Sequence, residues 1–242
     1  MFGAAGGAGF GSTQWSMVLA ARDGEPERAQ AALEELCATY WRPLYHYVRR
    51  SGYSVEDAQD LTQTFFARLL ERDTLRHVDP ALGKFRAFLL ASLKNFLANE
   101  WRRGQAMKRG GAAQFLSLEE MTRAEEGCAV VAAAPLTPER VYERNWAMAL
   151  LGRAAARLEA EFTAAGKSRV YGQLKQYLTG DREARYSEVA AALGISEVTV
   201  RVSVHRMRGR FRELLQDEVG RTLAEPGEAA IEEELRHLLA IL

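Results

Sequence analysis

The chain has 242 residues, of which 48% are hydrophobic and 26% are charged, as in an ordinary globular protein. Its 32 Lys and Arg residues balance its 32 Asp and Glu residues, so net charge indicates no particular partner. Membrane-length apolar runs, a signal-peptide start and clustered Cys or His are all lacking, which predicts a cytoplasmic protein without a metal or cofactor.

The N-terminal part of the chain predicts a flexible tail followed by helices. Residues 1–12, MFGAAGGAGFGS, are small and Gly-rich, which is typical of a flexible segment. A short helix is expected at 15–21. Apolar residues at three- and four-residue steps predict a second helix from 26 to 50, which Pro43 should kink or break.

Two further helices are expected before a change of composition. Ser54 with Asp57 three residues later forms an N-cap with an acidic partner, which predicts a helix to about Glu71. A loop at 79–83 precedes a long amphipathic helix expected over 84–103.

The middle of the chain predicts a linker and a second group of helices. Residues 104–136 are rich in Gly and Ala and weakly periodic, which is typical of a linker between domains. Thr137 as a cap with Pro138 behind it predicts a helix to about Ala164, and another is expected at 167–178.

The last hundred residues predict two short helices around a tight turn, followed by an acidic tail. The turn is Gly194-Ile195-Ser196. In the tail, 217–242, apolar residues share one face of an expected amphipathic helix: Ile231, Leu235, Leu238 and Leu242. This face could dock on the protein's own surface or on a regulator.

The stretch from 196 to 215 is compatible with either a strand or a helix. Its valines alternate with polar residues, as in a half-buried strand. Three arguments favour a helix. A lone strand in a helical chain would leave its backbone groups without hydrogen-bond partners. Gly194 suits the end of one helix and Ser196 the start of the next, and helical spacing places the apolar residues on a single stripe. The stripe comprises Val200, Val204, Met207, Phe211, Leu214 and Leu215.

The opposite face of that expected helix is basic and exposed. No Asp or Glu occurs from Val198 to Arg212. Two helices joined by a Gly-containing turn, the second presenting Arg201, Val202, His205 and Arg206 outward, form a helix-turn-helix suited to the DNA major groove. For Arg208, Arg210 and Arg212, DNA contact and simple solvation remain open.

The residues of both halves resemble one family. YSEVAAALGISEVTVRVSVHRMRGRFRELL resembles the DNA-binding domain of bacterial RNA polymerase sigma factors of the extracytoplasmic-function (ECF) type, in the sigma-70 family. SVEDAQDLTQTFFARLL is similar to the family's polymerase-binding helix, and GKFRAFLLASLKNFLANEWRR to its promoter-melting segment. The motifs occur in the family's order over about residues 13–216.

The resemblance implies an all-α fold with two small helical domains, a flexible linker and a C-terminal helical tail. The expected boundaries are a tail at 1–12, a region 2-like domain at 13–103, a linker at 104–136, a region 4-like helix-turn-helix domain at 137–216 and an acidic extension at 217–242.

The resemblance also assigns contact residues to three surfaces. Polymerase binding falls on Asp57, Asp60 and Gln63. Capture of the downstream promoter element falls on Lys94, Asn95, Asn99, Trp101, Arg102 and Arg103. Upstream-element contact falls on Arg201, Val202, His205 and Arg206, and Arg208 is a further candidate from its place on the same helix.

The function expected from these motifs is promoter recognition and DNA melting together with core RNA polymerase. The expected partners are core polymerase, promoter DNA and a possible anti-sigma factor or other regulator, with no membrane and no small-molecule substrate. No nucleophile motif or phosphate-binding Gly loop occurs, so an enzyme is not expected. The alternative is a stand-alone helix-turn-helix regulator, which would leave the acidic helix at 54–71 without a role.

Overall fold

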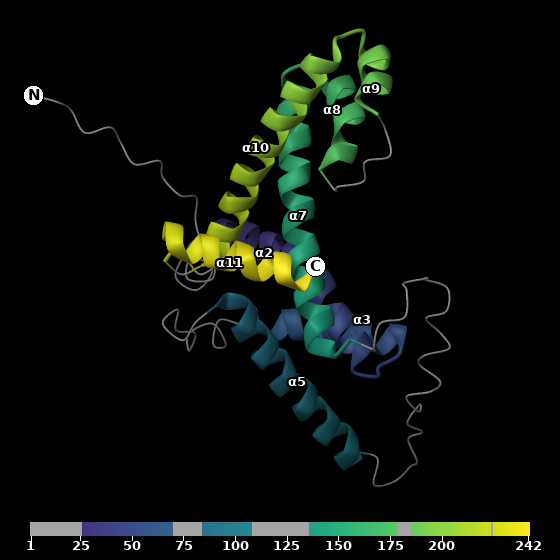
Figure 1. The fold of residues 1–242 in the computed structure, drawn as a ribbon. Coiled ribbons are helices and arrows are strands. Elements are labelled where there is room, and N and C mark those ends of the chain that lie inside the picture. The colour runs from purple at the N-terminus through teal and green to yellow at the C-terminus, as the bar shows by residue number, and fades with distance from the viewer. Residues whose placement is uncertain (1–25, 70–83, 108–135, 179–184, 224) are drawn as a thin grey trace, which may run out of the picture. The chain divides into compact units, whose positions relative to one another are not determined.

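The computed structural model describes residues 26–69, 84–107, 136–178, 185–223 and 225–242 (Figure 1). Every regular element in these residues is a helix, which confirms the all-α prediction. The expected tail at 1–12, the helix at 15–21, the loop at 79–83 and most of the linker lie outside the described residues. Within the described residues, no helix is both long enough and apolar enough to cross a bilayer.

The chain divides by its internal contacts into two compact units. Unit 1 combines Met1–Ala149 with Arg221–Leu242, and unit 2 is Leu150–Gly220. The helices α7 (Pro138–Ala164) and α10 (Glu197–Thr222) each have residues in both units. The expected boundary at 216/217 therefore lies inside α10, and the C-terminal tail groups with the first unit.

Unit 1 is built on α2 (Pro26–Arg50), α3 (Val55–Leu69) and α5 (Phe85–Met107). Of the kink or break expected at Pro43, the break is absent, since α2 runs from its first residue to its last with Pro43 inside. A proline inside a helix removes one hydrogen bond and costs about 3 kcal/mol. Burial of Tyr40 and Leu44 on either side of Pro43 offsets that cost, so packing overrides the local signal.

Aromatic rings form much of the unit 1 core. Tyr40 of α2 meets Phe85 of α5 edge to face with ring centroids 5.5 Å apart, and Phe65 of α3 lies 5.7 Å from Phe96 of α5. All four side chains are buried. The two aromatics of α5 in this set therefore hold the three helices together and cannot stack on DNA bases.

The C-terminal helix α11 (Glu228–Ile241) packs against its own chain. Its apolar stripe is buried within unit 1 through Ile231, Leu235 and Leu238. Glu234 lies on the same stripe and forms ion pairs with Lys84 and Arg86 at the start of α5. Of the two docking surfaces left open for the tail, the structure shows the protein's own.

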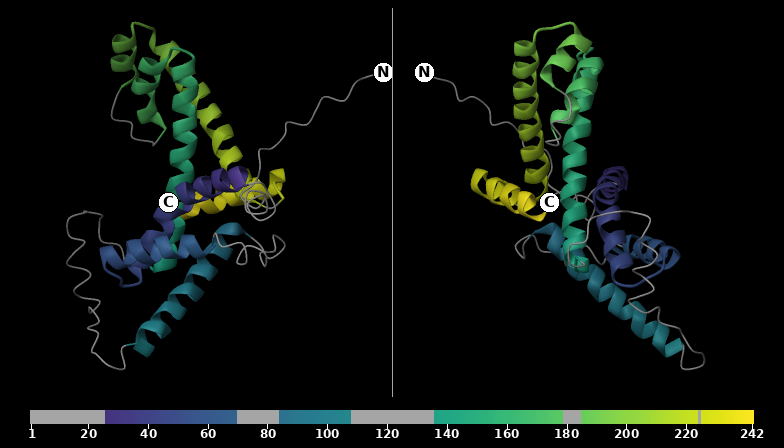
Figure 2. Two further views of the ribbon diagram at one scale, coloured as in Figure 1. Left: turned by 180° about the vertical axis from the view of Figure 1, so that it is seen from behind. Right: turned by 45° about the vertical axis from the view of Figure 1, so that its right-hand side comes forward.

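Unit 2 places α8 (Ser168–Leu174), the 3-10 turn η3 (Lys175–Tyr177) and α9 (Tyr186–Leu193) beside residues 150–164 of α7 and 197–220 of α10 (Figures 1 and 2). The helix expected at 167–178 thus ends in a 3-10 turn. The helix that follows the Gly194–Ser196 turn was expected to be short, but α10 has 26 residues.

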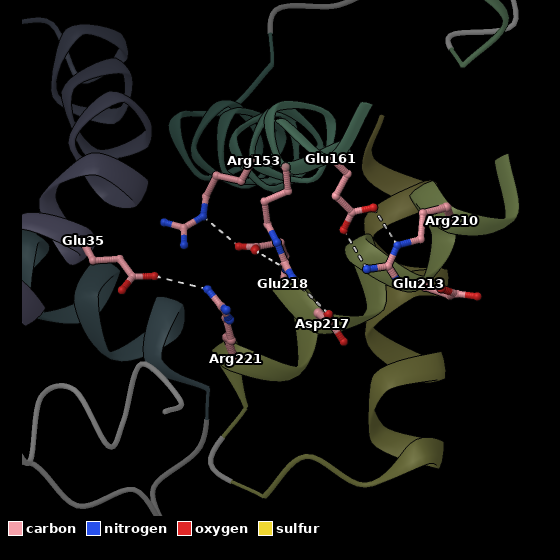
Figure 3. Close-up of polar contacts among 9 residues, drawn as sticks. Glu35, Arg153, Glu161, Arg210, Glu213, Asp217, Glu218 and Arg221 are labelled. Atoms are coloured by element: carbon pink, nitrogen blue, oxygen red, sulfur yellow. Dashed lines mark hydrogen bonds and ion pairs between the residues drawn. The ribbon is translucent and has the colours of Figure 1, made fainter. Parts of the chain in front are cut away.

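Ion pairs join α7 and α10 in antiparallel order within unit 2. Arg153 Nε donates to Glu218 at 2.7 Å, and Arg210 donates to both carboxylate oxygens of Glu161 at 2.7 and 2.9 Å (Figure 3). Because later residues of α7 pair with earlier residues of α10, the two helices run in opposite directions. Glu218 is buried, so its pairing with arginine satisfies a charge that would otherwise be costly to bury.

Candidate nucleic-acid interface

The turn between α9 and α10 is fixed by hydrogen bonds at both helix ends. Gly194 has φ of 69°, and its N–H donates to Ala191 while that of Ile195 donates to Ala190 at 3.0 Å. This is the double bond pattern that ends a helix at a left-handed glycine. The hydroxyl of Ser196 accepts from the N–H of Thr199 at 3.1 Å and caps α10. Both caps were predicted from the sequence, and the helix over 196–215 is confirmed.

The first turns of α10 divide its valines between two faces. Val200 and Val204 are buried, whereas Val198 is 68% exposed and Val202 is 44% exposed. Val198 and Val202 are one helical turn apart, so they form a small exposed apolar patch. Exposed apolar patches rimmed by polar residues are typical of contact surfaces. The exposed residues predicted for DNA contact share this side of the helix: Arg201, Val202, His205 and Arg206.

The two arginines on this face, Arg201 and Arg206, have side chains that are available to a ligand. Among the described residues neither Arg201 nor Arg206 has a carboxylate partner. The guanidinium carbon of Arg201 lies 5.9 Å from the ring centroid of Tyr186, whose ring in turn lies 5.1 Å from that of Tyr177. The aromatic pair supports Arg201 without neutralising its charge.

The arginines further along α10 have intramolecular partners. Arg208 donates from Nε and Nη2 to the Tyr177 carbonyl at 3.0 and 2.7 Å, at the end of η3. Arg210 pairs with Glu161 and Glu213, and these carboxylates raise the pKa of its guanidinium. Arg208, which the sequence assigned to DNA, therefore also anchors η3 to α10.

A second exposed polar face follows α5. Asn95, Asn99 and Arg102 lie within about 60° of one another around the helix at 3.6 residues per turn, and all three are exposed. Arg102 Nη1 donates to Asn99 Oδ1 at 3.1 Å. Trp101 is 52% exposed, in contrast to the buried Phe85 and Phe96, so it is an aromatic of this helix that a base could stack on.

Two other basic residues of α5 are paired. Lys94 Nζ lies 2.7 Å from Glu139 Oε1 in the first turn of α7, within unit 1. Arg103 lies 3.0 Å from Glu100, which also accepts from Arg68 at 2.6 Å. The side chains of Lys94 and Arg103 remain largely exposed, so these pairs can be exchanged for other anions at small cost.

The exposed side of α3 carries the predicted polymerase contacts. The Ser54 hydroxyl donates to Asp57 Oδ2 at 2.9 Å and accepts from the Asp57 N–H at 3.0 Å, so Asp57 takes part in capping the helix. Asp60 and Gln63 are exposed one turn further on. Their spacing of three residues places them side by side.

The sequence interpretation missed the ion-pair cluster of Glu234, Lys84 and Arg86. One signal was present, because Glu234 falls between the apolar residues Ile231 and Leu235 on the predicted buried stripe. Its partners are 148 and 150 residues away in sequence, which no local pattern reveals. Among the described residues, no group of three His, Cys, Asp or Glu side chains could hold a metal ion.

Comparison with known proteins gives a family match over the part of the chain that contains α3 and α5. Residues 36–107, which include α3, α5 and most of α2, match the family model of sigma-70 region 2. Neither a curated protein nor a solved structure matches the chain significantly. The match covers the helices that carry Asp60, Asn95 and Trp101, and it supports a sigma factor of the sigma-70 family with a role in promoter recognition and transcription initiation.

Proposed function

We propose that the protein is an ECF-type sigma factor that joins core RNA polymerase in the cytoplasm and directs it to promoters. The observation that carries the proposal is the region 2 match over residues 36–107. The helix-turn-helix of unit 2 supports it independently, because a second, groove-sized helix with exposed arginines follows region 2 in the chain.

In this proposal α3 binds core polymerase through Asp60 and Gln63, with Asp57 contributing at the helix start. Acidic and amide side chains at helical spacing suit a basic partner surface. Asn95, Asn99, Trp101 and the basic residues of α5 take hold of the melted strand of the downstream element. Stacking on an exposed aromatic and contacts to phosphates are the usual means of holding single strands.

The upstream element is read by the start of α10. Arg201 and Arg206 would donate to guanine or phosphate, and the exposed Val202 would contact a thymine methyl group. The phosphate contacts supply salt-dependent affinity, and each good base contact supplies about 1–3 kcal/mol of discrimination. The protein itself performs no covalent chemistry in this mechanism.

Binding to purified core polymerase separates this function from that of a stand-alone regulator. A sigma factor co-elutes with core polymerase on size exclusion, and the double variant Asp60→Ala/Gln63→Ala elutes apart from it. Failure of the wild-type protein to bind core, together with specific binding to duplex DNA as a dimer, would favour the regulator.

A further inference from the structure

The carboxylate of Glu234 is buried at the start of α5. Its side chain is 0% exposed and forms ion pairs with Lys84 and with Arg86, which is itself 8% exposed. Arg86 is held in place by the ring of Trp146, 4.3 Å from its guanidinium carbon. Replacing a buried ion pair by apolar residues is often neutral or stabilising, so stability alone does not account for the presence of Glu234.

A second carboxylate pairs with the same helix. Glu139 and Lys94 are 2.7 Å apart, and each side chain is 45% exposed. The hydrogen bond between them lowers the pKa of Glu139 and raises that of Lys94, so both groups stay charged around neutral pH. Carboxylates from α7 and α11 thus form ion pairs with basic side chains at two places, one at the start of α5 and one further along it.

The basic side chains that these carboxylates hold lie on or beside the predicted DNA-contacting face. Lys84, whose carbonyl accepts the first hydrogen bond of α5, falls within about 20° of Asn95 and Arg102 around the helix. Lys84 and Lys94 are about 15 Å apart along the axis. Lys84 is 40% exposed even when paired, so an anion other than Glu234 can reach it.

We propose that Lys84 extends the DNA-contacting face of α5 and that, in the free protein, Glu234 and Glu139 pair with the lysines that bind DNA phosphates in the complex. This inference rests on the proposed function and adds a contact residue and an internal competitor to it. Phosphate oxygens accept charge-assisted hydrogen bonds from lysine as carboxylate oxygens do, so one anion can replace the other. The segments α7 and α11 then keep the free protein from binding DNA through α5.

The test measures binding of the free full-length protein to a fluorescein-labelled single-stranded oligonucleotide by anisotropy, over a series of salt concentrations. Glu139→Gln and Glu234→Gln should each raise affinity several-fold. The slope of log K against log salt should steepen by about 0.7 for each additional phosphate that the variant neutralises on single-stranded DNA. Lys94→Ala should cancel the higher affinity of Glu139→Gln, and Lys84→Ala that of Glu234→Gln.

Glu225→Gln is the matched control, because it removes the same charge from an exposed position outside α11 and should leave affinity unchanged. Circular dichroism establishes folding; if Glu234→Gln unfolds α11, the exposed Glu139–Lys94 pair decides the test. The proposal is overturned if Glu139→Gln binds as weakly as wild type, or if the higher affinities persist after the lysine substitutions. Transcription by the wild-type protein with core polymerase is scored separately, so a failed competitor and a failed sigma function are distinguishable.

Discussion

Arg86 of α5 lies over the indole ring of Trp146 of α7, with its guanidinium carbon 4.3 Å from the ring centroid. Trp146 is fully buried, and the Tyr142 hydroxyl one turn earlier donates to the Arg86 carbonyl at 3.0 Å. The start of α7 and the start of α5 therefore meet through one cation–π contact and one hydrogen bond within unit 1. Glu234 of α11 adds a buried ion pair with the same Arg86.

Trp146→Ala should lower the free energy of unfolding by about 3–5 kcal/mol, because it leaves a large cavity and removes the support of a buried arginine. Urea denaturation followed by circular dichroism measures the change. Met148→Ala on the same helix is the control, since Met148 is 55% exposed and its truncation should cost less than about 0.5 kcal/mol. Equal losses in the two variants would contradict this packing.

Arg201→Ala and Arg206→Ala should each reduce promoter-specific transcription by about 5- to 150-fold while binding to core polymerase is unchanged. Each removes an exposed donor worth about 1–3 kcal/mol of base discrimination. The measurement is run-off transcription alongside a core-binding assay. An undiminished transcript from both variants would place DNA contact elsewhere on the protein.

Arg208→Ala should lower stability by about 1–3 kcal/mol, because its guanidinium donates twice to the Tyr177 carbonyl. Thermal unfolding detects this effect without DNA. Arg206→Ala, at an exposed position two residues earlier on α10, serves as the comparison. If Arg208→Ala lost only promoter activity and kept its melting temperature, the anchoring role would be wrong and DNA contact would account for the residue.

Asp60→Ala/Gln63→Ala should weaken binding to core polymerase and leave the fold intact, because both side chains are exposed. Asp57→Ala should behave differently, since it also loses the hydrogen bond that its carboxylate accepts from the Ser54 hydroxyl, worth about 0.5–1.5 kcal/mol. Equilibrium binding to core and thermal unfolding separate the two effects. Wild-type core affinity in the double variant would rule out this docking surface.

The stability of unit 1 should fall as the pH drops below about 6.5. Burial, and after it the positive charge of Arg86, lowers the pKa of His237 on α11 below its ordinary value, with Glu143 opposing the shift. The unfolded chain therefore takes up a proton at a higher pH than the folded protein, and protonation favours unfolding.

Melting temperatures at pH 7.5 and 5.5 measure this dependence. His237→Gln should shrink the difference between them. An unchanged difference in His237→Gln would show that His237 does not contribute.

The orientation of α10 could be predicted from the sequence because its determinants are local. Gly194 and Ser196 fix where one helix ends and the next begins, and the 3.6-residue repeat separates Val200 from Val202. The partners of Arg208 and Glu234, and the Glu161 partner of Arg210, could not be predicted, because each lies on another element. Pro43 does not break α2, because the buried residues around it outweigh one missing hydrogen bond.

In the proposed function, this chain supplies promoter specificity to core RNA polymerase. Run-off transcription with purified core polymerase on a library of promoter sequences tests it most directly. Transcripts should require the protein and start downstream of two elements at a fixed spacing, and the upstream preference should change in Arg201→Ala. Transcripts from core polymerase that are the same with and without the protein, on every sequence in the library, would contradict it.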